Sequence, residues 1–180
     1  MGDNSEKPSY LGLLNAIAVG EGRGRELLDA WAQKTTNAEL KQLLTMVAIR
    51  AQEHAASFAK RLCELGYAVR PSPAGDFAAR LSMMKSDTSD RVKFDCVFDF
   101  GKPLLESDTL ANVFHDKSID IETGALLGRF IAEERDSERK LRACYEQLRD
   151  TPADDTLSEI CARLERLTRS IEELKAIRGR

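Results

Sequence analysis

Four ionisable side chains stand at positions where helical stripes would otherwise be apolar: Glu21, His54, Glu133 and Glu134. His54 lies in the middle of an apolar series from Leu40 to Leu65 whose members recur every three or four residues. That spacing places them all on one face of a helix. Imidazoles and carboxylates pointing into a helical bundle are typical metal ligands. The same groups could instead satisfy one another as a metal-free cluster of histidine, glutamates and arginines.

The polar interruptions fall near the middle of three different predicted helices. One polar residue in an apolar stripe is most often a hydrogen-bonded core residue. Three at similar depth predict one shared pocket. Glu21 is also flanked by Gly20, Gly22 and Gly24, a cluster that predicts close approach of a neighbouring helix or a local irregularity, since glycine is unfavourable in a helix interior.

The periodicity predicts long helices over about 9–34, 37–65, 118–149 and 152–177. Ser9, Thr36 and Ser118 are the expected N-caps of the first three helices, and Gly66 is the expected C-terminal glycine of the second. The turn between the first two helices is short, so they should form an antiparallel hairpin. We expect residues 1–8 to be a disordered tail and residues 9–178 to form a single helical domain.

Residues 67–117 form a long connection between the predicted hairpins. The run from Arg70 to Gly75 contains two prolines and a glycine, and short apolar clusters follow it. Because a long structureless loop is rare inside a domain, we expect two or three short helices here. Phe94, Phe98 and Phe114 predict that the connection packs on the bundle.

The order of hairpin, crossover and hairpin resembles the ferritin-like superfamily, in particular its uncharacterised bacterial members. The di-iron site of that fold takes a glutamate from each of two helices and a Glu-x-x-His from each of the other two. Glu21 is similar to the lone glutamate, and Ala51 to His54 is similar to a Glu-x-x-His with alanine in place of glutamate. Glu133 to Ser137 resembles an acidic ligand segment with serine where a histidine could stand. The resemblance implies an all-α, ferritin-like four-helix bundle with an incomplete site.

Three functions follow as expectations. The first is a ferritin-like helical protein with a degenerate, metal-free di-iron site and no cofactor, because the helix over 152–177 offers no ligand on its seam. The second is a di-iron or manganese oxidoreductase, or an iron-handling protein, using Glu21, His54 and Glu133 or Glu134. The third is a module that binds a small apolar molecule near the phenylalanine-rich connection. No catalytic residue is assigned, and the ligand count argues against an enzyme.

Composition narrows the classes of partner. The 180 residues carry a net charge of −3 with acids and bases interspersed, so we expect no nucleic-acid partner. No apolar run approaches the roughly 20 residues of a membrane span. We expect a cytoplasmic protein because no signal peptide or C-x-x-C pair is visible. Leu13, Leu27 and Ile49 lie off the main stripes and predict a homodimer.

Overall fold

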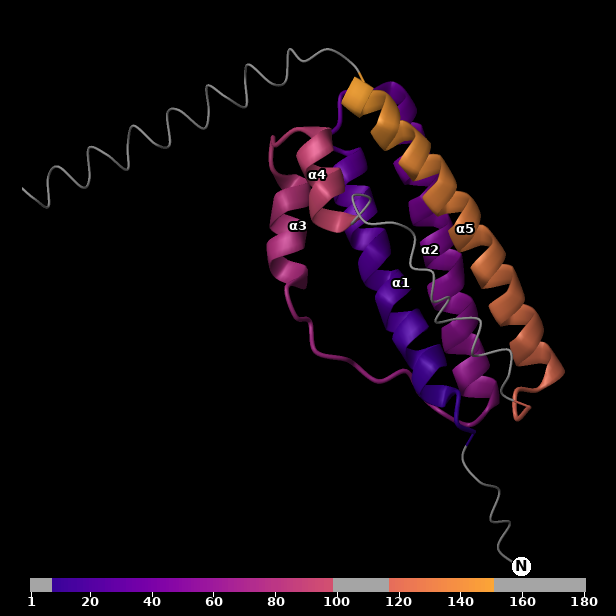
Figure 1. Ribbon diagram of the computed structural model, residues 1–180. Coiled ribbons are helices and arrows are strands. Elements are labelled where there is room, and N and C mark those ends of the chain that lie inside the picture. Colours follow the sequence, from indigo (N-terminus) through magenta and orange to yellow (C-terminus); the bar gives the residue numbers. More distant parts are fainter. Residues whose placement is uncertain (1–7, 99–116, 151–180) are drawn as a thin grey trace, which may run out of the picture. The chain divides into compact units, whose positions relative to one another are not determined.

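The computed structural model describes residues 8–98 and 117–150, with side chains through residue 148 (Figure 1). These residues form helices without any strand: α1 (Leu11–Ala32), α2 (Ala38–Glu64), α3 (Phe77–Lys85), α4 (Asp90–Val97) and α5 (Ile121–Asp150). The all-α prediction is therefore confirmed for this part of the chain. The chain divides into two compact units, Met1–Tyr145 and Glu146–Arg180, and the contacts below lie within the first. The helix predicted over 152–177, the predicted tail and Phe114 fall outside the described residues. The single domain and the four-helix arrangement stay predictions.

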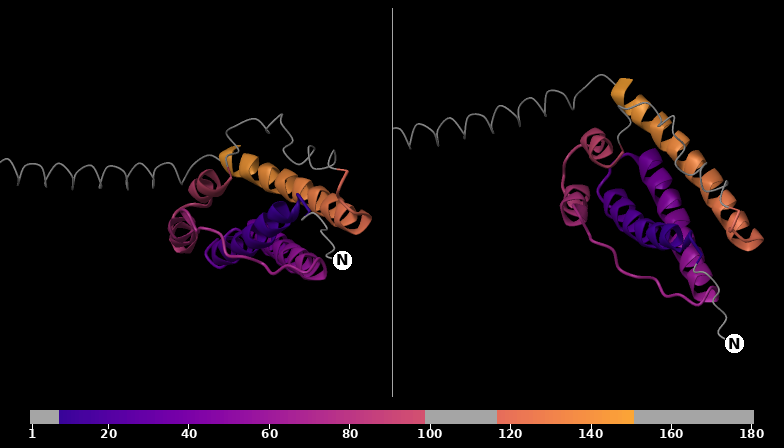
Figure 2. Two further views of the ribbon diagram at one scale, coloured as in Figure 1. Left: turned by 90° about the horizontal axis from the view of Figure 1, so that it is seen from below. Right: turned by 60° about the horizontal axis from the view of Figure 1, so that its bottom comes forward.

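Helices α1 and α2 form the predicted hairpin and lie side by side in both figures that show the ribbon (Figures 1 and 2). The apolar stripe of α2 is buried over its whole length from Leu40 to Leu62, with His54 among its buried members. One core cluster joins this hairpin to α5; its buried residues are Tyr10, Leu11, Leu14, Ile17, Ala18, Phe58, Leu62, Leu127, Phe130 and Ile131. Helices α1, α2 and α5 therefore share one core, and the predicted site residues lie on these three helices.

The ends of α2 test the predicted caps. Asn37, not Thr36, is the N-cap: its backbone is extended and its side chain accepts a hydrogen bond from the Leu40 amide at 3.0 Å. The cap prediction was wrong by one residue because threonine and asparagine are both good caps and only the backbone decides between them. Gly66 ends α2 as predicted, with φ of 83°, a conformation that favours glycine.

The starts of α1 and α5 also differ from prediction. Tyr10 rather than Ser9 precedes α1, and no side chain caps that helix. Asp120 rather than Ser118 caps α5, because its carboxylate accepts the Thr123 amide at 2.9 Å. Asp120 therefore fixes where the helix that carries Glu133 and Glu134 begins.

The Asp120 carboxylate also ties α5 to the hairpin. It accepts hydrogen bonds from the Tyr10 hydroxyl and from the Arg61 guanidinium, each at 2.8 Å. Partial burial raises the pKa of Asp120, but hydrogen bonds from Thr123, Tyr10 and Arg61 outweigh it and hold the pKa well below its usual range. Because the folded-state pKa is lowered, this group stabilises the fold above its unfolded pKa, and the contribution is lost as pH falls.

Asp120→Ala is expected to lower the free energy of unfolding at pH 7 by about 1–2 kcal/mol, because the cap of α5 is lost. The side chain is 37% exposed, so solvent screens the Arg61 ion pair and little is added for it. Urea denaturation at pH 7 and pH 3 measures the effect, which should shrink at pH 3. Glu122→Ala is the control, since Glu122 also contacts Arg61 but is 79% exposed. Equal losses in the two variants would contradict this role.

Two short helices, α3 and α4, occupy the described part of the connection, as predicted. Phe94 of α4 is fully buried and packs edge-on against Trp31 of α1, with ring centroids 4.7 Å apart. The Trp31 indole N–H donates to Asp90 at 2.6 Å. Arg23 of α1 donates to the Pro73 carbonyl at 3.0 Å. The described part of the connection is therefore fastened to α1 at both ends.

The glycines beside Glu21 do not mark a close helix contact. A Cβ built at Gly20, Gly22 or Gly24 would meet nothing within 4 Å, and α1 runs unbroken through them. The predictions of a close helix contact and of a local irregularity at these glycines are therefore both wrong.

Two depressions lie on the surface of the described residues. The first, of about 350 Å³, is lined by Ala18, Val19, Gly22, Arg23, Arg25, Glu26, Gln52 and Ala55. The second, of about 680 Å³, is lined by Ser57, Lys60, Arg61, Glu64, Glu122 and Leu126. Charged side chains line both, so neither favours the apolar-ligand hypothesis.

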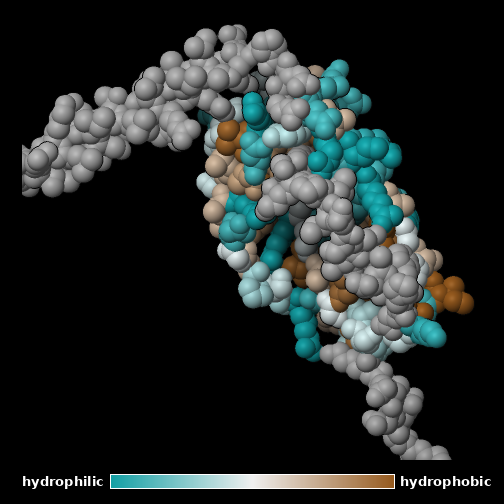
Figure 3. Space-filling model, viewed as in Figure 1, coloured by the Kyte–Doolittle hydropathy of each residue, from teal (hydrophilic) through white to brown (hydrophobic). Residues whose placement is uncertain are grey.

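The surface of the described residues is relevant to the predictions about a membrane and about a homodimer. Hydrophilic residues dominate the uncovered face of the described helices in Figure 3, with separate hydrophobic patches. No helix among the described residues has the length and apolar content needed to cross a membrane. Leu27 is buried and Leu13 packs against the core, whereas Ile49 is 54% exposed. The homodimer stays a prediction, and Ile49 alone of these three residues still supports it.

Candidate metal centre

The structure brings the four predicted site residues together from three helices. Glu21 comes from α1, His54 from α2, and Glu133 and Glu134 from α5. The Glu133 Oε2 atom lies 2.7 Å from the Nε2 atom of His54. The Glu21 Oε2 and Glu134 Oε1 atoms lie 3.4 and 3.6 Å from its Nδ1 atom. These side chains therefore lie in one shared pocket, as the sequence predicts. Their role as metal ligands remains a prediction.

His54 is held in one orientation at the centre of the group. It is 3% exposed, and its ring meets the Phe130 ring edge-on at a centroid distance of 5.0 Å. Phe58 packs against Phe130 in the same way at 5.3 Å. These rings form an apolar boundary on one side of the imidazole, which explains why a histidine is compatible with an otherwise apolar stripe.

The two ring nitrogens of His54 have different surroundings. Nε2 has a short contact with Glu133, whereas Nδ1 is buried and has no aligned hydrogen-bond partner in the described part of the chain. The Nδ1 atom nevertheless faces the carboxylates of Glu21 and Glu134. A buried polar atom without a partner is uncommon in proteins and calls for a bound group or a proton.

The two carboxylates that face Nδ1 act on each other. Burial, and then the neighbouring Glu21 carboxylate, raises the pKa of Glu134 to about 7, against opposing effects of His54 and Arg50. Burial lowers the pKa of His54, but contacts with Glu21 and Glu133 outweigh it and raise the pKa above its ordinary value. The Glu21 carboxylate thus contributes to both shifts, adding to burial at Glu134 and opposing it at His54, and such a gathering of negative charge attracts a cation.

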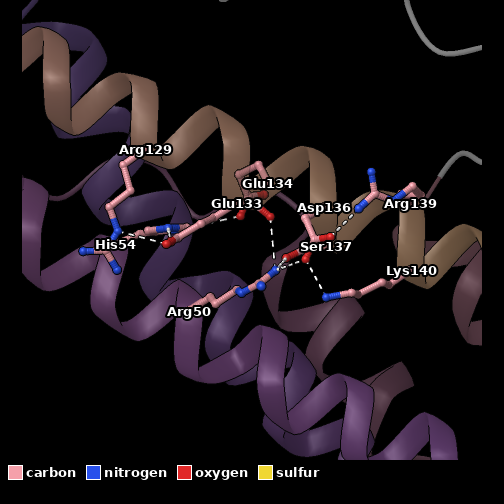
Figure 4. A network of polar contacts seen from close by, with 9 residues as sticks. All are labelled: Arg50, His54, Arg129, Glu133, Glu134, Asp136, Ser137, Arg139 and Lys140. Atoms are coloured by element: carbon pink, nitrogen blue, oxygen red, sulfur yellow. Dashed lines mark hydrogen bonds and ion pairs between the residues drawn. The ribbon is translucent and has the colours of Figure 1, made fainter.

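Glu133 differs from its neighbour Glu134. Its second oxygen accepts a hydrogen bond from Arg129 at 2.9 Å (Figure 4). Arg129 also approaches Glu53 of α2 at 3.6 Å. Burial raises the pKa of Glu133, but the hydrogen bonds from Arg129 and His54 outweigh it and lower the pKa. Glu133 is therefore a charge-balanced carboxylate on the Nε2 edge of the imidazole. Sequence reasoning treated the two glutamates as equivalent, and the structure separates them.

Arg50 lies one helical turn from His54 on α2 and was predicted as a possible partner of Glu133 or Glu134; its side-chain partners are instead Asp136 and Ser137. Its Nη1 atom donates to Asp136 Oδ2 and to Ser137 Oγ, each at 2.9 Å (Figure 4). Ser137 is buried at 2% exposure and Ala51 at 5%. The positions where the ferritin-like pattern would place further ligands thus hold a methyl group and a hydroxyl bound to a guanidinium. The sequence does contain one indication that Arg50 belongs to the site, because Arg50 lies one helical turn before His54 and so on the same side of α2.

Three of the four residues form a candidate donor set for a metal ion. Single ligand atoms of Glu21, His54 and Glu134 all lie within 4.8 Å of one another. Among the described residues, no lysine or arginine forms an ion pair with Glu21 or Glu134, in contrast to Glu133 and Asp136. The buried Nδ1 and the carboxylates of Glu21 and Glu134 fit a divalent cation in both donor type and charge.

Comparisons with known proteins do not identify the chain. No family model, curated protein or solved structure matches it. The ferritin-like resemblance therefore stays a prediction, and the functional argument rests on the geometry of Glu21, His54 and Glu134.

Proposed function

We propose that this chain is a ferritin-like helical protein that binds one divalent transition-metal ion through Glu21, His54 and Glu134. The observation that carries the proposal is the buried Nδ1 atom of His54, which faces the Glu21 and Glu134 carboxylates at 3.4 and 3.6 Å and has no aligned hydrogen-bond partner among the residues that the structure describes. Leaving such an atom unpaired costs about 1–3 kcal/mol. A bound cation would satisfy the nitrogen and relieve the repulsion between Glu21 and Glu134 in one step.

The donor set narrows the class of metal. One imidazole and two carboxylates suit zinc, iron(II) or manganese(II) better than calcium, which prefers oxygen ligands throughout. The charge also fits, because two carboxylates that form no ion pair with a lysine or arginine of the described residues balance a dication. Three protein ligands would leave coordination positions for water or a small molecule; a metal held by these residues would supply Lewis-acid chemistry, and iron or manganese would also supply redox chemistry.

Arg50 supports a site for one ion rather than two. Paired metals in proteins lie about 3.5–4 Å apart and share carboxylate ligands. Here the adjoining turn presents the Arg50 guanidinium, already bound to Ser137 and Asp136, and Ala51 supplies no donor. A fixed positive charge beside a single-ion site disfavours a second cation. The ligand count that argued against a di-iron site thus leaves room for a single ion.

A second candidate is the metal-free protein that the sequence favours. The raised pKa of His54 supports an imidazolium that donates from Nδ1 toward Glu21 and Glu134 without any metal. In that case the protein acts through its surface, and the site is a structural ion cluster. The two candidates differ in what occupies the space beside Nδ1, which metal binding tests directly.

Protein stripped of metal by a chelator is expected to bind one equivalent of zinc or manganese(II) in a calorimetric titration with elemental analysis. Glu21→Gln and Glu134→Gln should each weaken binding at least about 10-fold, because even residues that only support a ligand contribute 10–100-fold.

Glu26→Gln is the matched control, since Glu26 is an exposed glutamate on the same helix as Glu21. It should bind like the wild type. Absence of binding to the wild type, or equal binding by all variants, would favour the metal-free imidazolium.

A further inference from the structure

We infer that Glu133 is a positioning residue: its carboxylate holds the Nε2–H of His54 and so turns the Nδ1 lone pair toward Glu21 and Glu134. The consequence for metal affinity rests on the proposed function, whereas the effect on the histidine tautomer can be measured without metal. This assignment replaces the expectation that Glu133 and Glu134 are alternative ligands.

The short contact sets the tautomer. Nε2 lies 2.7 Å from the Glu133 Oε2 atom, and an ionised carboxylate only accepts hydrogen bonds. The contacts of Nδ1 with Glu21 and Glu134 are longer, at 3.4 and 3.6 Å, so the short contact places the hydrogen of a neutral His54 on Nε2. Neutral imidazole carries one N–H, so Nδ1 is left with a lone pair. Histidine ligands of metals are commonly fixed in this way by a carboxylate on the other ring nitrogen.

Glu133 is itself held in place. Its Oε1 atom accepts from the Nε atom of Arg129 at 2.9 Å while its Oε2 atom contacts His54. The two oxygens thus have separate partners, which fixes the plane of the carboxylate. Arg129 also lies 3.6 Å from Glu53 of α2, so the arrangement bridges α5 and α2 on the side of the imidazole away from Glu21.

The position of Glu133 argues against a direct ligand role in the same site. Glu21 and Glu134 approach Nδ1, and Glu133 approaches Nε2. The two nitrogens point in different directions from the ring, so an ion bound to Nδ1 does not share the Nε2 contact. A metal on Nε2 would require Glu133 to exchange its contact with His54 for a ligand role, and would leave Nδ1–H facing two carboxylates.

Nitrogen NMR of the histidine ring tests the inference in metal-free protein, at a pH where His54 is neutral. The chain has two histidines, and His54→Ala identifies the signal of interest. The wild type should show the Nε2–H tautomer. Glu133→Ala should lose this preference and bind zinc about 10–100-fold more weakly. Glu133→Gln keeps a carbonyl acceptor and should retain more of both properties, which separates positioning from loss of folding.

Glu138→Ala is the matched control, because Glu138 also pairs with an arginine four residues away on α5, Arg142, at 3.1 Å. It should change neither tautomer nor affinity. A wild-type Nδ1–H tautomer, or a Glu133→Ala variant with unchanged tautomer and affinity, would overturn the inference while leaving metal binding intact. If the wild type binds no metal but shows the Nε2–H tautomer that Glu133→Ala loses, positioning stands and the proposed function fails.

Discussion

His54→Ala is expected to weaken zinc or manganese(II) binding by more than about 100-fold. The variant removes the single nitrogen ligand of the proposed donor set. The resulting loss of metal affinity should exceed the 10–100-fold loss that follows when a residue supporting a ligand is removed. It also removes the group that links α2 to Glu21, Glu133 and Glu134. Calorimetric titration of chelator-treated protein measures the loss, and circular dichroism checks that the helices remain.

His115→Ala is the control for this variant, because His115 is the other histidine of the sequence and is not among the proposed ligands. It should bind metal as the wild type does. Free imidazole added to His54→Ala should recover part of the binding, since the space left by the ring lies beside Glu21 and Glu134. Equal affinity of His54→Ala and the wild type would remove His54 from any metal site.

Phe94→Ala is expected to lower the free energy of unfolding by about 3–5 kcal/mol, the usual cost of emptying a buried aromatic position. Phe94 is fully buried, and its ring lies 4.7 Å from Trp31 and 5.5 Å from Tyr145 between centroids. The side chain thus joins α4 to α1 and α5. Urea denaturation followed by circular dichroism measures the loss.

Phe98→Ala provides the comparison, because Phe98 lies in the same segment but is only partly buried. Its loss should be clearly smaller. A loss of unfolding free energy below about 1 kcal/mol for both variants would be well below the range for a buried aromatic residue. It would show that the connection is loosely attached to the helices.

The sequence predicts the long helices well, because apolar residues recur along each of them at one helical spacing. The stripe on α2 is buried as expected, and α1, α2 and α5 begin and end within three residues of the predicted bounds. The reason is that burial of one helix face depends on spacing alone. Caps were less predictable, since Asn37 and Asp120 compete with neighbouring residues of similar capping strength and the local backbone decides.

The candidate site was predictable in position but not in detail. Polar residues at similar depth on three helices sufficed to place Glu21, His54 and Glu134 in one pocket. Spacing does not tell which edge of an imidazole a carboxylate approaches, so it could not distinguish Glu133 from Glu134. It also did not show that Arg50 binds Ser137. These differences arise from side-chain conformation and from partners distant in sequence.

We propose that one divalent ion binds at the Nδ1 atom of His54. A crystal structure of the zinc-loaded protein, with diffraction data on both sides of the zinc absorption edge, tests it most directly. We expect one anomalous peak at about 2.0–2.2 Å from Nδ1 and from a carboxylate oxygen of each of Glu21 and Glu134, with Glu133 still bound to Nε2. A well-ordered His54 without any peak beside Nδ1, or a peak between Nε2 and Glu133, would contradict it.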